Sequence, residues 1–129
     1  RLQQELGMSI LYITHDLGVI AETADDVIVM YLGKVVECAD VDSLFYDPQH
    51  PYTQALLRSI PRVDRDSEEP LESIKGVVPD PYSLPEACPF HPRCPSCVKG
   101  LCDVKEPPIV RLGDNIWVRC HQCRQGSGE

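Results

Sequence analysis

The first sixty residues carry apolar runs separated by short polar breaks, a pattern that predicts strands and helices in alternation. Residues 9–14 (SILYIT) form a nearly continuous apolar run, which is typical of a strand covered on both faces in a parallel sheet. Two further strands are predicted at residues 26–31 and 34–38. Because Gly33-Lys34 favours a tight turn between them, these two strands are expected to form a hairpin.

Helical spacing and capping residues predict the remaining elements of this half. Apolar residues recur at three- and four-residue intervals from Leu17 to Ala24, and Asp40 and Pro51 stand where a helix cap and a first helical residue are favoured. Gly7 is placed to end an earlier helix, and Pro61 ends the last one. The predicted helices cover residues 1–6, 17–24, 41–46 and 51–60.

The pattern changes from residue 61 onward. Ten of the twelve prolines lie at or beyond Pro61, and the apolar periodicity is lost. We therefore divide the chain into residues 1–46 as an α/β core segment, 47–75 as a helical extension with an acidic linker, and 76–129 as a cysteine-rich tail. With little apolar area, such a tail needs a staple to offset the entropy of ordering its loops.

The charge and length of the chain exclude some functions. The formal net charge of −8 argues against nucleic-acid binding, since phosphate neutralisation requires clustered lysine and arginine. No apolar run approaches the roughly 18 residues of a membrane span, and no signal peptide opens the chain. Because Arg1 is the first residue, we expect these 129 residues to belong to a longer protein.

His15 is a candidate binding residue because of its place after the first predicted strand. In open α/β sheets, ligands bind beyond the carboxyl ends of the strands, and His15 directly follows residues 9–14. A helix-capping or core histidine is the alternative interpretation of the same position.

The cysteines are the second candidate site. Six of the seven lie between Cys88 and Cys123, which favours metal binding over a disulfide framework in a chain without a signal of secretion. The spacing alone shows two C-x-x-C pairs, Cys94 with Cys97 and Cys120 with Cys123, a pattern typical of tetrahedral zinc sites. Cys38, within a predicted strand, is interpreted as a small buried apolar residue.

Three motifs together resemble a known family. The stretch ILYITHDLGVIAETADDVIVMYLGKVVE resembles the switch-histidine region of ABC transporter ATPases, and LFYDPQHPYTQALLRSIP is similar to the extension of the oligopeptide and dipeptide importer branch. CPFHPRCP and VRCH resemble the cysteine-bearing tail of that branch. The resemblance implies an α/β fold: the C-terminal part of a P-loop NTPase core, followed by an irregular, proline-rich tail stapled by a metal held by cysteines.

The same resemblance assigns a function to His15. It implies that His15 is the switch histidine, a catalytic residue that contacts the γ-phosphate of ATP, while Asp16 caps the next helix. ATP and Mg²⁺ are the implied cofactors. The chain has no G-x-x-x-x-G-K-S/T phosphate loop, signature loop or strand ending in a magnesium-binding carboxylate, so we expect it to be inactive alone.

For the tail, the resemblance implies a [4Fe–4S] cluster with a structural or redox-sensing role. The implied ligands are Cys88, Cys94, Cys102 and Cys120.

The alternatives to this ligand set remain open. Cys102 lies one residue further from Cys94 than in the family pattern, which keeps Cys97 in contention as the third ligand. Cys123 is either a bystander or a ligand of zinc. His91 and His121 are interpreted as surface or neighbouring groups that are less favoured as ligands.

The resemblance also implies partners and a location. It predicts membrane-spanning permease subunits, a second ATP-binding subunit and, indirectly, a peptide-binding protein, at the cytoplasmic face of the plasma (inner) membrane. No nucleic-acid partner is expected. Self-association is expected because apolar strand edges are left open. The rival hypothesis is a small zinc-stapled interaction module with no ATPase role.

Overall fold

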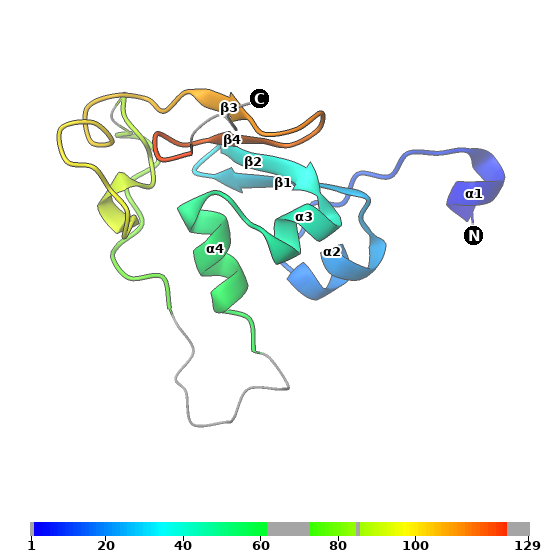
Figure 1. The fold of residues 1–129 in the computed structure, drawn as a ribbon. Helices are drawn as coiled ribbons and strands as arrows, with labels where there is room; N and C mark the ends of the chain where they lie inside the picture. The colour runs from blue at the N-terminus through cyan, green and yellow to red at the C-terminus, as the bar shows by residue number, and fades with distance from the viewer. Residues whose placement is uncertain (1, 62–72, 85, 124–129) are drawn as a thin grey trace.

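The fold is a four-stranded antiparallel sheet with helices on one side, seen in a computed structural model that describes residues 2–61, 73–84 and 86–123 (Figure 1). The strand order is β1-β2-β4-β3. The helices and strands are α1 (Leu2–Leu6), α2 (Leu17–Thr23), β1 (Asp26–Tyr31), β2 (Lys34–Asp40), α3 (Val41–Tyr46), α4 (Pro51–Arg58), the 3₁₀ helix η1 (His91–Arg93), β3 (Ile109–Arg111) and β4 (Trp117–Arg119).

The predicted hairpin of β1 and β2 is confirmed, with its turn displaced by one residue. Tyr31 pairs with Lys34, so the loop consists of Leu32 and Gly33 rather than Gly33 and Lys34. Both loop residues have positive φ, 47° and 78°. A two-residue loop with this conformation matches the right-handed twist of the strands it connects.

A β-bulge explains two neighbouring buried residues in β2. Val29 pairs with Glu37 and Met30 with Val35, which leaves Val36 without a partner across the ladder. Val36 and Glu37 are each only 1% exposed. An inserted residue breaks the alternation of strand side chains, so consecutive residues can both be buried.

The tail contributes two strands that the sequence analysis did not predict. Glu37 pairs with Val118 and Cys38 with Trp117, and β4 in turn pairs with β3. The sheet therefore joins residues of the first segment to residues of the third. Strands of three residues are too short to produce a recognisable alternation, which is why the pattern missed them.

The strand predicted at residues 9–14 is wrong. These residues form no strand, and Leu11 and Ile13 remain 83% and 91% exposed. A parallel strand requires a neighbour that receives its backbone hydrogen bonds. No strand in the described ranges lies beside this segment, and the sheet that does form is antiparallel throughout. The self-association expected from such open apolar residues stays a prediction.

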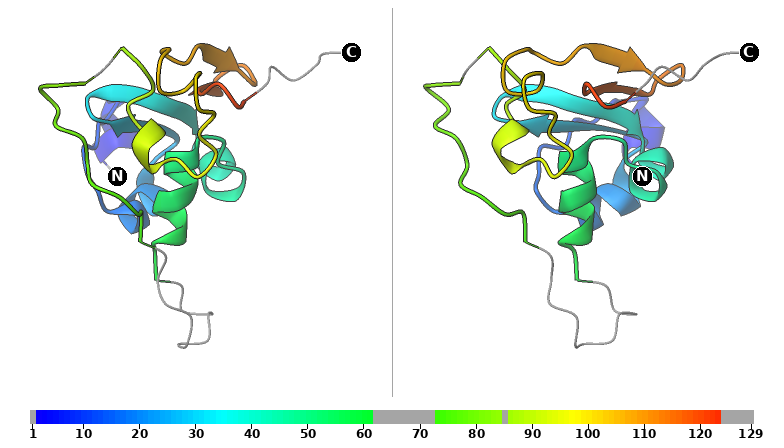
Figure 2. Two further views of the ribbon diagram at one scale, coloured as in Figure 1. Left: turned by 90° about the vertical axis from the view of Figure 1, so that its left-hand side faces the viewer. Right: turned by 60° about the vertical axis from the view of Figure 1, so that its left-hand side comes forward.

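The predicted helices are confirmed, with the expected caps. The Asp40 carboxylate accepts the Ser43 N–H at 2.9 Å, and Gly7 has a φ of 61° after α1. α2, α3 and α4 lie on the same side of the sheet, whereas α1 stands away from it (Figures 1 and 2). No helix in the described ranges combines the length and apolar character needed to cross a membrane.

The largest core cluster joins the hairpin to the cysteine-rich tail. Tyr31 and Val36 pack with Phe90, Cys88 and Cys102, all of them buried. In Figure 2 the loops of residues 86–108 accordingly lie beside the hairpin and α4. Tail and hairpin thus share one hydrophobic interior.

The prediction that Cys38 is buried is only partly correct. Its side chain is half-buried rather than fully buried, since its position in β2 points to the more open face of the sheet. Burial nevertheless raises the pKa of its thiol, which keeps it protonated at neutral pH.

Candidate functional site

His15 lies in an exposed loop that its two neighbours hold in place. The Asp16 N–H donates to the Thr14 hydroxyl at 3.0 Å. The Asp16 carboxylate accepts the N–H groups of Gly18 and Val19 at 3.0 and 3.2 Å and caps α2, as predicted. His15 itself is exposed, so the alternative of a core histidine is wrong, and capping is performed by Asp16.

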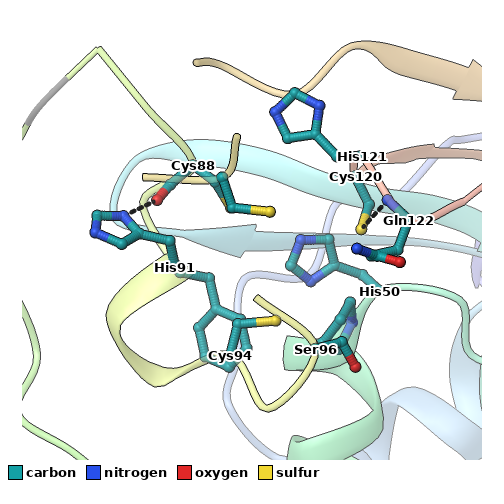
Figure 3. A pocket seen from close by; sticks show the side chains of 11 residues that line it. His50, Cys88, His91, Cys94, Ser96, Cys120, His121 and Gln122 are labelled. Carbon is teal, nitrogen blue, oxygen red and sulfur yellow. Dashed lines mark hydrogen bonds between the residues drawn. The ribbon is translucent and has the colours of Figure 1, made fainter. Parts of the chain in front are cut away.

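The four cysteines of the importer pattern line a single small pocket, away from His15. The cavity has a volume of about 10 Å³, roughly the space of one water molecule. Figure 3 shows the sulfur atoms of Cys88, Cys94 and Cys120 turned toward the space around the His50 ring. The lining residues are His50, Pro51, Cys88, Phe90, His91, Cys94, Ser96, Cys102, Cys120, His121 and Gln122. Cys97 and Cys123 are not among them.

His50 forms the inner wall of this pocket and is 1% exposed. Its Nδ1 atom accepts the Tyr52 N–H at 3.0 Å, which caps α4. The ring also interacts with the Arg119 backbone. Because Nδ1 accepts the Tyr52 N–H, the neutral ring carries its proton on the other nitrogen. Burial lowers the pKa of His50 to about 4.

Glu37 is a buried anchor for the same corner of the fold. Its carboxylate accepts the N–H of Gln49 at 2.7 Å and the N–H of His50 at 2.9 Å. A carboxylate at a helix N-terminus also interacts favourably with the helix dipole. Glu37 is not among the site residues predicted from the sequence. A charged residue in the otherwise apolar run of residues 35–39 was the signal that could have revealed it.

The other two histidines that line the pocket each donate one ring N–H to a backbone carbonyl oxygen. His91 Nδ1 lies 2.8 Å from the Cys88 carbonyl oxygen, and His121 Nε2 lies 2.9 Å from the Lys105 carbonyl oxygen. Because a carbonyl only accepts, these nitrogens carry the protons. Each ring retains its second nitrogen, yet the interpretation of both residues as neighbouring groups rather than ligands stays a prediction.

Burial and neighbouring sulfurs control the protonation of the pocket thiols. Burial raises the pKa of Cys88, and raises that of Cys94 to about 11. Negative charge on one sulfur further disfavours charge on the others, since Cys88 and Cys94 both lie within the electrostatic reach of Cys120. A bound cation would relieve this repulsion and hold the thiols as thiolates.

Cys120 behaves differently because of its neighbour Cys123. A hydrogen bond from the Cys123 thiol lowers the pKa of Cys120 and correspondingly raises the pKa of Cys123. The Gln122 N–H also donates to the Cys120 sulfur at 3.4 Å (Figure 3). These interactions favour the thiolate form of Cys120 near neutral pH.

The donor chemistry of the pocket fits a thiolate-bound metal, although its present geometry is not a coordination shell. Four sulfur atoms converge from loops of the tail, and thiolates are the ligands that zinc and iron–sulfur clusters share. Within the described residues, no three histidine, cysteine or carboxylate groups lie close enough together to hold a metal ion. Metal binding would therefore require the sulfurs to rearrange.

Comparisons with known proteins agree with the resemblance of the motifs. Residues 36–102 match the family described as "Oligopeptide/dipeptide transporter, C-terminal region". The chain is 46% identical over 120 residues to the dipeptide transport ATP-binding protein DppD of Escherichia coli, covering 93% of this chain and 36% of that protein. It is 50% identical over 119 residues to the oligopeptide transport ATP-binding protein AppD of Bacillus subtilis, covering 92% and 36%.

A third relative extends the same picture. A putative peptide import ATP-binding protein of Brucella ovis is 43% identical over 125 residues, which covers 93% of this chain and 37% of that protein. The chain therefore spans about a third of the length of the curated relatives it matches.

Proposed function

The chain belongs to the family of the oligopeptide/dipeptide transporter C-terminal region, and on this premise we propose that it is part of the ATP-hydrolysing subunit of a peptide importer. The supporting observation is the high identity to three ATP-binding proteins of peptide import over more than nine-tenths of the chain. ATP hydrolysis, with Mg²⁺, is proposed for the complete protein. The zinc-stapled module without an ATPase role is not favoured by these relatives.

In this proposal, His15 is the switch histidine at the γ-phosphate. Its exposure and the loop fixed by Thr14 and Asp16 support the assignment, because the ring can reach a ligand while its backbone stays in place. Phosphoryl transfer depends on positioning and on neutralising developing charge. An imidazole N–H can donate one hydrogen bond to a γ-phosphate oxygen and help to orient the attacking water.

The test is ATP turnover by the complete subunit with His15→Ala. Loss of one such donor is expected to reduce kcat about 100-fold or more, while ATP affinity changes little. The matched control is Glu22→Gln, on an exposed position of the same helix that His15 precedes. Normal turnover in His15→Ala, or an equal loss in the control, would refute the assignment.

We also propose that Cys88, Cys94, Cys102 and Cys120 hold a [4Fe–4S] cluster, with zinc as the alternative metal. What supports this set over the two C-x-x-C pairs is that these four line one pocket, whereas Cys97 and Cys123 do not. The cluster would supply a cross-link between loops of the tail, and a centre able to change its oxidation state. The protein's own contribution is the buried wall of His50 and Phe90, which limits access of water.

Partners and location follow from the same proposal. The complete subunit would bind membrane-spanning permease subunits and a second ATP-binding subunit, peripherally at the cytoplasmic face of the inner membrane. A peptide-binding protein would act indirectly. Co-purification of permease subunits with the tagged complete protein from membranes is the expected result, and recovery from the soluble fraction alone would argue against it.

A further inference from the structure

His121 joins two segments of the tail that carry proposed metal ligands. Its ring Nε2 lies 2.9 Å from the backbone carbonyl oxygen of Lys105, a residue 16 positions earlier in the chain. His121 directly follows Cys120, and Lys105 lies three residues beyond Cys102. One hydrogen bond therefore connects the segments of two of the four proposed ligands.

An ion pair beside this bond joins the same two segments. The Glu106 carboxylate lies 3.2 Å from the guanidinium group of Arg119, and these two residues are the neighbours of Lys105 and Cys120 in the sequence. Arg119 also donates its Nε–H to the carbonyl oxygen of Val35 in β2 at 3.2 Å. The exposed ion pair by itself contributes little stability. The segment before Cys120 is nevertheless attached to the sheet, and residues 105 and 106 are held beside it.

The segment of a third proposed ligand is attached in the same way. The Cys88 N–H donates to the Cys102 carbonyl oxygen at 3.0 Å. Cys88, Cys102 and Cys120 are all buried. Hydrogen bonds that involve no metal thus connect these three segments into one unit, in which His121 supplies the bond between the second and the third.

The His121 ring is placed to hold backbone rather than to bind metal. Because a carbonyl oxygen only accepts, Nε2 carries the proton. In Figure 3 the ring lies outside the group of sulfurs that surrounds the His50 ring. His91 differs in what it connects, since its ring contacts the carbonyl oxygen of Cys88, three residues away in the same loop.

We propose that His121 is a positioning residue of the thiol pocket, whose ring N–H holds the Cys102 segment against the Cys120 segment before metal binds. This role rests on the proposed thiolate centre. The two segments then move as one unit when the sulfurs rearrange around a metal. Binding therefore costs less conformational entropy, and the affinity for metal rises. Loss of a group that orients metal ligands typically lowers the affinity about 10- to 100-fold.

Two substitutions separate positioning from ligation. In His121→Gln, a side-chain amide N–H takes the place of the Nε2–H group, but the second ring nitrogen, which could bind metal, is lost. His121→Leu loses both groups. The control is Asp114→Asn, at an exposed position in the loop between β3 and β4. The reduced full chain of each protein is titrated anaerobically with Co²⁺ against a competing chelator, and the thiolate-to-cobalt absorption reports the sulfur ligands.

The two substitutions should give different results. We expect His121→Leu to bind Co²⁺ about tenfold more weakly or worse, with the thiolate absorption per bound ion unchanged. His121→Gln and Asp114→Asn should bind as the wild type does. An altered spectrum in both His121 variants would identify a ligand, and unchanged affinity in His121→Leu would leave the residue without a role at the site. Either result overturns the proposal.

A metal-free measurement separates this inference from the metal centre itself. In chelator, hydrogen exchange followed by mass spectrometry reports the amides of Cys88 and Lys105, which donate to the carbonyl oxygens of Cys102 and Leu101. Exchange at these amides should be about tenfold faster in His121→Leu and unchanged in His121→Gln. If the wild type takes up neither Co²⁺ nor iron and sulfide, the proposed centre fails. Faster exchange in His121→Leu would then still support the connection between the segments, whereas equal exchange would overturn it.

Discussion

The buried carboxylate of Glu37 accepts the backbone N–H of His50 at 2.9 Å, and this contact joins β2, one of the two inner strands of the sheet, to the start of α4. The ring of the same histidine forms the wall of the thiol pocket. Glu37 therefore holds the start of α4, and with it the His50 ring that lines the pocket, against β2.

Replacing Glu37 by alanine should destabilise the fold strongly. One buried and one half-buried N–H group lose their acceptor, for which we expect a loss of about 3 kcal/mol in the free energy of unfolding measured with urea. Glu37→Gln keeps one acceptor oxygen and should lose about half as much. Glu86→Ala, at an exposed position, serves as the control and should change stability by less than about 0.5 kcal/mol.

The buried His50 predicts a specific pH dependence of stability. Its pKa is about 4 in the folded chain against 6.5 when unperturbed, so the unfolded chain binds the proton first as the pH falls. Stability should therefore decline between pH 6.5 and 4, by at most about 3 kcal/mol.

The matched variant for this effect is His50→Asn, measured by urea unfolding at each pH in metal-free buffer. Asparagine can still accept the Tyr52 N–H as a helix cap, but it does not titrate. Its stability curve should lack the His50 contribution in that pH range. Identical pH dependence in both proteins would contradict the assignment.

The turn between β1 and β2 allows the stability cost of a positive φ angle to be measured. Gly33 has a φ of 78°, and a Cβ there would meet no atom within 4 Å, so Gly33→Ala should cost about 1 kcal/mol through conformation alone. Gly113→Ala is the comparison, since its Cβ would make ordinary contacts with Ile116 at 3.6 Å. Its effect on the melting temperature should be clearly smaller than that of Gly33→Ala.

The proposed set of metal ligands predicts which cysteines are required for metal binding. In anaerobically purified protein, serine at Cys88, Cys94 or Cys120 should each reduce bound metal severalfold, whereas serine at Cys97 should not. Visible absorption with iron, sulfide and zinc assays distinguishes a cluster from zinc. Full metal retention in Cys88→Ser, or its loss in Cys97→Ser, would require a different ligand set.

Local structure in the first half was predictable because its causes lie in neighbouring residues. Asp16 and Asp40 cap helices through side chains that reach N–H groups two or three residues away, and Pro51 begins α4 where proline is favoured. The hairpin follows equally from a short loop containing Gly33. The apolar run at residues 9–14 shows the limit of this reasoning, since a strand also depends on a partner that its own sequence does not specify.

The sequence by itself determined the helices, the hairpin and the motifs that relate this chain to peptide importers, because each depends on residues close together in the chain. Only the tertiary structure decided that β4 pairs with β2, that Glu37 is buried against the start of α4, and that Cys88, Cys94, Cys102 and Cys120 line one pocket. Those relationships join residues up to about eighty positions apart, through backbone pairing and shared burial. Spacing along the chain contains no information about which distant groups meet when apolar area is removed from water.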